Sequence, residues 1–355
     1  MKATEDPAKR QRRGHGRPTL HEVADAAGVT RITVSRFIRE PGKVAPETAA
    51  RIQAAIQQTG YVPNHQAGQL ASGASRIVAA LIPNVGHSIF AETIQGLTEG
   101  LRDSGRELLL MATGYSLEHE ESQLRALLGW APGALIVTGR QHTPAALRML
   151  RDAQDGGTAV IEIWDHPEDE DSEDGFARIG FDHKAIGRTM ARHLLDQGHR
   201  ALAYVDSGVA EDYRAHERGE GFAAECEARG AKVHALTAGT GDAFDAGRAV
   251  LMALGSDAKR PVTAAAFAND HLACGALMQA QSLGISVPGQ LALLGFGDFP
   301  IGRQLLPALT TMRPPRAGIG QAAAEAVLAA MATGDEPVSR TMPCELIVRA
   351  STVPA

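Results

Sequence analysis

Three stretches before residue 61 carry apolar residues at the three- and four-residue spacing of amphipathic helices. Thr19 stands three residues before Glu22, which is the spacing of a capping box, and Gly28 suits the left-handed turn that ends a helix. Thr30 is placed to cap the next stretch, and Pro46 suits the first turn of the last one. The pattern predicts helices over residues 19–28, 31–38 and 46–60.

An Ala-Gly-Val corner joins the first two of these helices, which is typical of a helix-turn-helix. The second helix has the size that enters a DNA major groove, where arginine chelates guanine, threonine and serine bond phosphates or base edges, and isoleucine contacts a thymine methyl. The alternative is a small helical bundle whose polar face meets only water. We expect DNA contacts from Thr19, Thr30, Arg31, Ile32, Thr33, Ser35 and Arg36.

Beyond Arg76 the pattern changes to short apolar runs that alternate with longer amphipathic stretches. This alternation is typical of parallel sheets covered by helices on both faces, and about ten runs exceed one comfortable sheet, so it predicts two subdomains. The helical stretches include residues 90–104, 184–197 and 269–283. The predicted strands are 77–82, 107–111, 134–137, 159–164, 178–181, 202–205, 232–236, 264–267 and 291–296.

The composition excludes several classes of protein. The 355 residues are 44% hydrophobic and 21% charged, which is ordinary for a globular chain and excludes a wholly disordered one. Because there is no apolar run of about 18 residues, no membrane span is expected. Three scattered cysteines do not suit a disulfide framework or a Cys-rich zinc site. The charged N-terminus lacks the apolar segment of a secretory signal, so a cytoplasmic protein is expected.

The net charge of −6 conceals an asymmetry between the two parts of the chain. Residues 1–75 hold 11 Lys and Arg against 6 Asp and Glu, whereas the remaining residues hold 24 against 35. A basic head of this kind can neutralise phosphates, while an acidic body avoids polyanions. The acidic run at residues 167–175 is the most linker-like interruption in the body and is most simply a solvated loop.

The order of these residues carries a resemblance. The string from Thr19 to Arg36 (TLHEVADAAGVTRITVSR), with Gly60-Tyr-Val-Pro-Asn64 and the residues after it, resembles the headpiece and hinge of the lactose/galactose repressor (LacI-type) family. The resemblance implies a hinge helix over about residues 64–71, with Asn64, Ala67 and Leu70 at the DNA and Leu70 as a minor-groove wedge. Taken alone, Leu70 is better interpreted as an ordinary buried leucine in a linker. Gly68 departs from the pattern, because it lowers the helix propensity of the hinge.

The resemblance extends through the body and implies two flavodoxin-like lobes similar to periplasmic sugar-binding proteins, with a ligand in the cleft between them. It implies a basic arm (1–17), a helix-turn-helix headpiece (18–62), a hinge (63–75) and an effector-binding body (76–355). Within the body, the N-lobe is expected at about 76–172 and 299–332, and the C-lobe at about 173–298 and 333–355.

Cleft residues are carried over from the family at the ends of strands. The resemblance implies effector contacts from Phe90, Arg218, Asn269 and Asp298. Each has a simpler interpretation. Phe90 can pack in the core, and Arg218 can pair with Asp212 or Glu220 on a helix face. Asn269 can cap a helix, and Asp298 can end a loop. Gly297 stands where most relatives have an aspartate that binds sugar hydroxyls, which argues against a pocket for a neutral sugar.

Three fragments, around residues 138–143, 162–165 and 179–183, resemble the gluconate-operon repressors within this family. They favour a sugar acid as effector, with Arg218 and either His142 or Arg214 facing its carboxylate, and with Glu162, Asp165 or Asn269 bonding its hydroxyls. The alternative for His142 is a surface or capped histidine. 

The sequence therefore predicts a repressor of sugar-acid catabolism that binds a pseudo-palindromic operator in double-stranded DNA as a homodimer and is released by a small effector. Within the same class, a neutral sugar or a corepressor is the alternative. A solute-binding protein is not expected, because such a protein would not need a DNA-binding headpiece. An enzyme is not expected, because no nucleophile–base pair, phosphate loop or metal-ligand cluster is recognisable, and no cofactor or metal is implied.

Overall fold

The computed structural model describes residues 18–62, 75–86, 89–166, 175–254 and 262–353. The chain divides after Ala74 into two compact units, the headpiece and the body, each of which we describe by itself. The predicted arm (1–17) and most of the predicted hinge (63–74), with Asn64, Ala67 and Leu70, lie outside the described residues. No helix in the described ranges is both long and apolar enough to cross a membrane.

The headpiece confirms the predicted helices. Its elements are α1 (Leu20–Ala27), α2 (Arg31–Arg39), the short 3₁₀ helix η1 (Pro41–Lys43) and α3 (Pro46–Thr59). Thr19 and Glu22 form the capping box, and Gly28 adopts the left-handed conformation with φ of 63°. The side chains of α1, α2 and α3 that face inward form one small core, made of Val23, Ala24, Ala27, Val34, Ile52 and Ala55.

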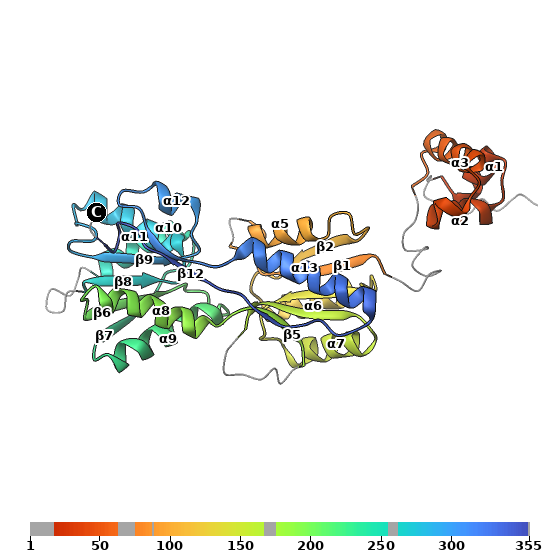
Figure 1. Ribbon diagram of the computed structural model, residues 1–355. Coiled ribbons are helices and arrows are strands. Elements are labelled where there is room, and N and C mark those ends of the chain that lie inside the picture. Colours follow the sequence, from red (N-terminus) through yellow and green to blue (C-terminus); the bar gives the residue numbers. More distant parts are fainter. Residues whose placement is uncertain (1–17, 63–74, 87–88, 167–174, 255–261, 354–355) are drawn as a thin grey trace, which may run out of the picture. The chain divides into compact units, whose positions relative to one another are not determined.

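The body contains two sheets, each of which forms one lobe (Figure 1). The first sheet has the order β11-β5-β4-β3-β1-β2 and the second has the order β12-β10-β9-β8-β6-β7, with β10 and β12 antiparallel and the other neighbours parallel. The strands are β1 (Ile77–Ile82), β2 (Glu107–Ala112), β3 (Ala134–Thr138), β4 (Ala159–Asp165), β5 (Ala177–Phe181), β6 (Ala201–Asp206), β7 (Lys232–Thr237), β8 (Ala264–Phe267), β9 (Ala292–Phe296), β10 (Thr310–Arg313), β11 (Arg340–Thr341) and β12 (Glu345–Ile347).

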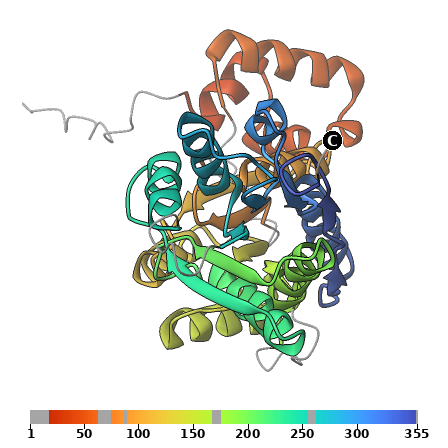
Figure 2. The ribbon, with the colours of Figure 1, turned by 90° about the vertical axis from the view of Figure 1, so that its left-hand side faces the viewer.

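Helices cover both faces of each sheet (Figures 1 and 2). In the first lobe these are α5 (Ala91–Gly100) and α13 (Arg316–Thr333) on one face and α6 (Leu117–Leu128) and α7 (Pro144–Asp155) on the other. In the second lobe, α8 (His183–Asp196) and α9 (Tyr213–Ala228) lie opposite α10 (Ala243–Leu254) and α11 (Asp270–Ser282), and the short α12 (Pro300–Gln304) follows β9. The predicted architecture of a helical headpiece and a two-lobed α/β body is confirmed.

The expected lobe boundaries are wrong in three places. β5 pairs with β4, so residues 177–181 belong to the first lobe, and the chain crosses only after Phe181. β10 pairs with β9 in the second lobe, whereas β11 returns to β5 in the first. The acidic run after residue 166 suggested a boundary between the lobes. However, the strands that precede and follow it, β4 and β5, are neighbours in one sheet. The short strands β10, β11 and β12 were absent from the prediction because their runs are too brief to show a pattern.

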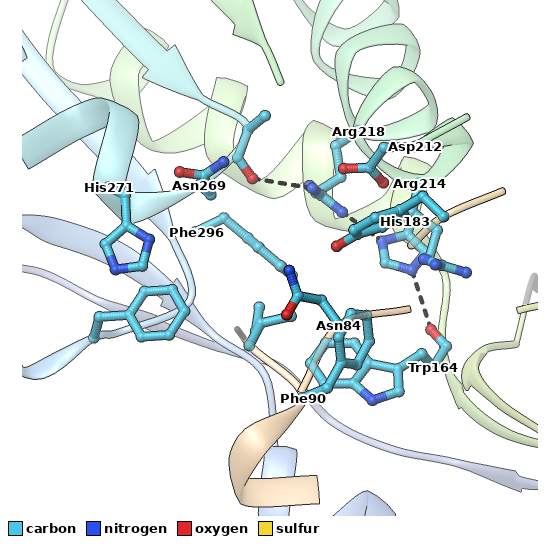
Figure 3. A pocket seen from close by; sticks show the side chains of 14 residues that line it. Asn84, Phe90, Trp164, His183, Asp212, Arg214, Arg218, Asn269, His271 and Phe296 are labelled. Carbon is cyan, nitrogen blue, oxygen red and sulfur yellow. Dashed lines mark hydrogen bonds between the residues drawn. The ribbon is translucent and has the colours of Figure 1, made fainter. Parts of the chain in front are cut away.

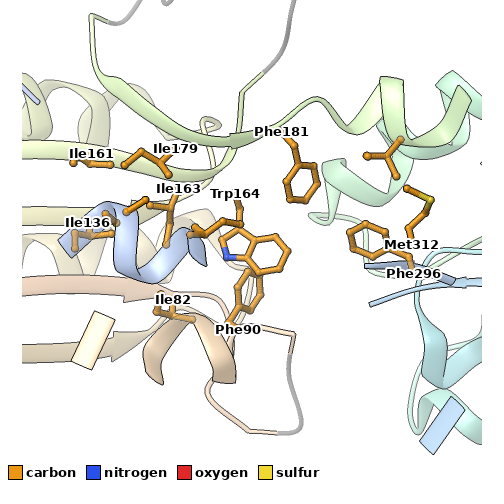
Figure 4. Packing of buried hydrophobic residues seen from close by; sticks show 14 of the residues in the cluster. Ile82, Phe90, Ile136, Ile161, Ile163, Trp164, Ile179, Phe181, Phe296 and Met312 are labelled. Carbon is orange, nitrogen blue, oxygen red and sulfur yellow. The ribbon is translucent and has the colours of Figure 1, made fainter. Parts of the chain in front are cut away.

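The apolar core continues from one lobe into the other. Trp164 at the end of β4 packs edge-on against Phe181 at the end of β5, with ring centroids 5.8 Å apart. Phe181 in turn lies 6.3 Å from Phe296, which belongs to the second sheet (Figure 4). Aromatic side chains of both lobes therefore meet where the chain crosses between them.

Glycine sets the distance between paired helices in both lobes. At each of these positions an added Cβ would clash with a backbone carbonyl oxygen of the partner helix, so the two backbones are in direct contact. The positions come in pairs on α5 and α13, on α8 and α9, and on α10 and α11: Gly96 and Gly320, Gly187 and Gly221, and Gly247 and Gly275.

We predict that Gly221→Ala lowers the free energy of unfolding of the body by about 1–3 kcal/mol, because its Cβ meets the carbonyl oxygen of Lys184. This loss opposes the gain of ~1 kcal/mol that alanine normally brings to a helix. Denaturant unfolding measures the difference. Gly239→Ala is the control, since nothing lies within 4 Å of its added Cβ. Equal stability of both variants would contradict direct backbone contact.

Candidate functional site

The headpiece presents α2 with an exposed polar face. Arg31 and Arg36 are exposed, and Ile32 is 71% exposed although it is apolar, while Val34 on the opposite face is fully buried. An exposed isoleucine between arginines suits a surface that meets an apolar group of a partner. Thr33 and Ser35, between these residues, are half-buried.

Two of the predicted DNA contacts are engaged in capping. The Thr19 hydroxyl accepts a hydrogen bond from the Glu22 backbone N–H at 3.4 Å. The Thr30 hydroxyl accepts one from the Thr33 backbone N–H at 3.3 Å and lies 2.9 Å from the Thr33 hydroxyl. Both threonines are exposed, so they fix the starts of α1 and α2 at the headpiece surface.

The body holds a cavity of about 160 Å³ between its lobes (Figure 3). It lies at the carboxyl ends of the parallel strands, where open α/β sheets bind ligands. Of the predicted effector residues, Phe90, Arg218 and Asn269 line it, and Arg214 does so too. The other lining residues are Asn84, Ile89, Tyr115, Trp164, His183, Asp212, Ala268, His271, Phe296 and Phe299.

The first lobe supplies an aromatic wall. Phe90 precedes α5 and packs edge-on against Trp164, with ring centroids 5.0 Å apart. The Trp164 indole N–H donates to the Thr93 hydroxyl at 3.2 Å, which fixes the ring. Phe90 is therefore both a core residue and a lining residue of the cavity.

Arg218 is the central charge of the second-lobe wall. It is 4% exposed, donates to His183 Nδ1 at 2.9 Å and to the Ala268 carbonyl at 3.0 Å, and lies 4.0 Å from the centroid of the Phe296 ring. Its Nε has no hydrogen-bond partner, and no carboxylate in the described part of the chain forms an ion pair with it. The expected alternatives, pairing with Asp212 or Glu220, are not observed. A buried cation without a counter-ion is costly unless a ligand supplies one.

His183 holds Arg218 in place as a neutral ring. Burial, followed by the charges of Arg218 and Arg214, holds the pKa of His183 well below its ordinary value. With Nδ1 accepting from Arg218, the proton sits on Nε2, which lies 3.1 Å from the Trp164 carbonyl oxygen and 3.4 Å from an Asp165 carboxylate oxygen. The histidine therefore adds no second positive charge to the wall.

Asp165 lies behind the cavity rather than in its lining. Its carboxylate accepts from the Tyr213 hydroxyl at 2.7 Å and from Arg214 at 3.2 Å. Burial raises the pKa of Asp165, and the arginine and the phenol act against that rise. Asp165 thus forms the ion pair of Arg214, whereas Arg218 has none in the described part of the chain. The Asp212 carboxylate lines the same cavity but forms no ion pair with Arg218.

Asn269 and Asp298 have different roles. Asn269 caps α11 by accepting from the Leu272 backbone N–H at 3.0 Å, and it also lines the cavity. Asp298 is fully buried outside the lining. Burial raises its pKa, but bonds from three arginines outweigh this and lower the pKa to about 2. They are Arg349, Arg303 and Arg313, at 2.6, 2.7 and 2.6 Å.

Gly297 adopts a φ of 133°, and an added Cβ would lie 2.8 Å from the Phe299 ring. Phe299 stacks on His271 with centroids 4.5 Å apart. This glycine therefore makes room for an aromatic pair at the cavity wall.

His142 and Glu162 are buried in the first lobe and do not line the cavity. The His142 side chain is 1% exposed and lies 2.6 Å from Glu120 and 3.4 Å from Glu162, which also accepts from Arg178 at 2.6 Å. Burial lowers the pKa of His142, but the two glutamates outweigh it and raise the pKa to about 9. This histidine is a charged structural anchor.

The sequence did not single out several lining residues, among them Asn84, Tyr115, His183 and His271. Asn84 follows β1 and Tyr115 follows β2, so their places after apolar runs were the available signal. Within the described ranges, no group of three or more His, Cys, Asp and Glu side chains is arranged to hold a metal ion.

We predict that His142 makes the body less stable as the pH rises towards 9. Because its folded pKa lies above the unfolded value of about 6.5, its contribution is complete below pH 6.5 and is lost as the pH rises through about 9. Urea unfolding between pH 6 and 10 should show a decline on the order of a few kcal/mol, which His142→Gln removes. A variant with the wild-type pH profile would contradict this assignment.

Comparisons with known proteins agree with both units. Residues 19–64 match the model of bacterial regulatory proteins of the lacI family, and residues 191–352 match that of the periplasmic binding protein-like domain. The HTH-type transcriptional regulator GntR of Pseudomonas aeruginosa is 37% identical over 95% of this chain and 96% of its own length. The regulator of the same name from Escherichia coli K12 is 33% identical over 88% of this chain and 92% of its own length.

A crystal structure of a LacI-family transcriptional regulator from Silicibacter pomeroyi superposes with a TM-score of 0.86 at 32% identity, and it covers 94% of this chain and 99% of that one. The covered length includes both the headpiece and the body. The chain belongs to the lacI family of bacterial regulatory proteins and is a DNA-binding transcription regulator.

Proposed function

We propose that the protein represses genes of sugar-acid catabolism and that a sugar acid such as gluconate binds in the cleft and releases it from its operator. The observation that carries this proposal is Arg218, a buried arginine of the cleft wall without an ion pair in the described part of the chain. A ligand carboxylate would supply the missing negative charge through charge-assisted hydrogen bonds.

The rest of the lining suits the remainder of such a ligand. The amide of Asn84 and the carboxylate of Asp212 can bond hydroxyl groups, and the rings of Phe90, Trp164 and Phe296 can cover the carbon chain. The fragments that resemble gluconate-operon repressors support the same class.

The DNA-binding side of the proposal rests on α2. One headpiece offers too few contacts for specific binding, so a homodimer would place two such helices on the halves of a pseudo-palindromic operator. An effector that weakens DNA binding must, by linkage, bind less tightly to the DNA-bound protein. Effector binding and operator binding are therefore thermodynamically coupled, and a change in one affinity is matched by a change in the other.

We predict that Arg218→Gln weakens gluconate binding by about 10- to 100-fold, the range expected when a hydrogen bond to a charged group is lost. Thermal shift measures it, since a ligand at a hundredfold excess over Kd stabilises the wild type by about 2.7 kcal/mol. Arg229→Gln is the matched control, because Arg229 is an exposed arginine at the end of the same helix and pairs with Asp196. Equal binding of gluconate and a neutral hexose would contradict the sugar-acid proposal.

We predict that Arg36→Ala weakens operator binding and reduces the slope of log K against log salt by about one, because one phosphate contact is lost. Filter binding or fluorescence anisotropy at several salt concentrations measures the slope. Arg51→Ala, which removes an exposed arginine of α3, should leave the slope unchanged. Identical slopes for the two variants would remove Arg36 from the DNA interface.

A further inference from the structure

One turn of α9 docks directly onto the opposite lobe. α9 packs within the second lobe, whereas Arg140 follows β3 of the first. The Arg140 guanidinium donates to the Glu217 carboxylate at 2.6 Å, and the Arg140 backbone N–H donates to the Tyr213 hydroxyl at 2.8 Å. The Tyr213 hydroxyl in turn donates to Asp165, at the end of β4 in the first lobe.

The contact is built for close approach and is shielded from water. The side chains of Arg140 and Glu217 are 12% and 15% exposed, so water screens the ion pair less than it screens a surface pair. Gly139 has a φ of 101°, and a Cβ there would lie 2.8 Å from the Tyr213 hydroxyl oxygen. Burial, and then the Asp165 carboxylate, raise the pKa of Tyr213, so its hydroxyl keeps the proton that it donates.

The docked turn also carries the arginines of the cavity wall. Tyr213 and Glu217 are four residues apart and share one face of the helix, while Arg214 and Arg218 follow each of them by one position and line the cavity. Any separation of the lobes that breaks the Arg140–Glu217 pair therefore also moves both arginines away from the aromatic wall of Phe90 and Trp164.

We propose that Arg140, Tyr213 and Glu217 form an interlobe latch, which holds the lobes closed before the effector binds and sets the effector concentration at which the protein responds. The second part of this inference rests on the proposed function. When the competent arrangement is populated only in part, the apparent Kd rises by the inverse of that fraction. The latch keeps the fraction high, so that ligand binding energy is not spent on closing the cleft.

The test replaces Glu217 by glutamine in the full-length protein. Without ligand, we expect amide exchange of Arg140 to accelerate by about tenfold, because its N–H loses the Tyr213 hydroxyl whenever the lobes part. With gluconate, we expect the concentration that releases operator DNA to rise by about tenfold, while release at saturation stays complete. The double variant R140E/E217R, which restores an ion pair with exchanged charges, should recover much of both losses.

Glu220→Gln is the matched control. Glu220 lies on the same helix, but its partner Lys184 at 3.3 Å belongs to α8 of the same lobe, so neither exchange at Arg140 nor the gluconate response should change. Wild-type exchange at Arg140 in the Glu217→Gln variant would overturn the latch. A wild type that ignores gluconate, together with accelerated exchange in Glu217→Gln, would instead overturn the proposed ligand and leave the latch supported.

Discussion

The body of this protein is organised around a positive charge that its described residues do not neutralise. Arg218 is buried between the Phe296 ring, the His183 imidazole and the Ala268 carbonyl, which fix its position but carry no formal negative charge. The neighbouring Arg214 forms an ion pair with Asp165. Elsewhere in the body, Asp298 accepts hydrogen bonds from three arginines. This difference between arginines with and without an ion pair is the observation that supports our proposal of an anionic ligand.

Much of the architecture could be predicted because it depends on local patterns. The capping box at Thr19, the glycine at residue 28 and the apolar runs of the sheets each act within a few residues, so the sequence shows them directly. The lobe boundaries depend on which strands pair, and that choice is made over long distances. The sequence of β5 suits the last strand of the first lobe and the first strand of the second lobe equally well. Only its pairing with β4 assigns it to the first lobe.

The candidate site was predictable to a similar extent. Arg218, Asn269 and Phe90 were found because the family resemblance assigns their positions. His142 lies in the loop after β3, Glu162 in the middle of β4 and Asp165 at its end. A sequence does not reveal which of these side chains faces the cleft. Their nearest partners, Glu120, Arg178 and Tyr213, are distant in the chain, so pairing among buried charges could not be foreseen.

The glycine contacts between paired helices bear on how the lobes can move. Where two backbones touch, as at Gly187 with α9 or Gly320 with α5, there is no intervening side chain whose rotamer can change to accommodate sliding. These helix pairs therefore resist sliding, and a rotation between the lobes would be absorbed by the φ and ψ angles of the connections after β5, β10 and β11. Hinge bending, rather than shear within a lobe, is the motion that this packing permits.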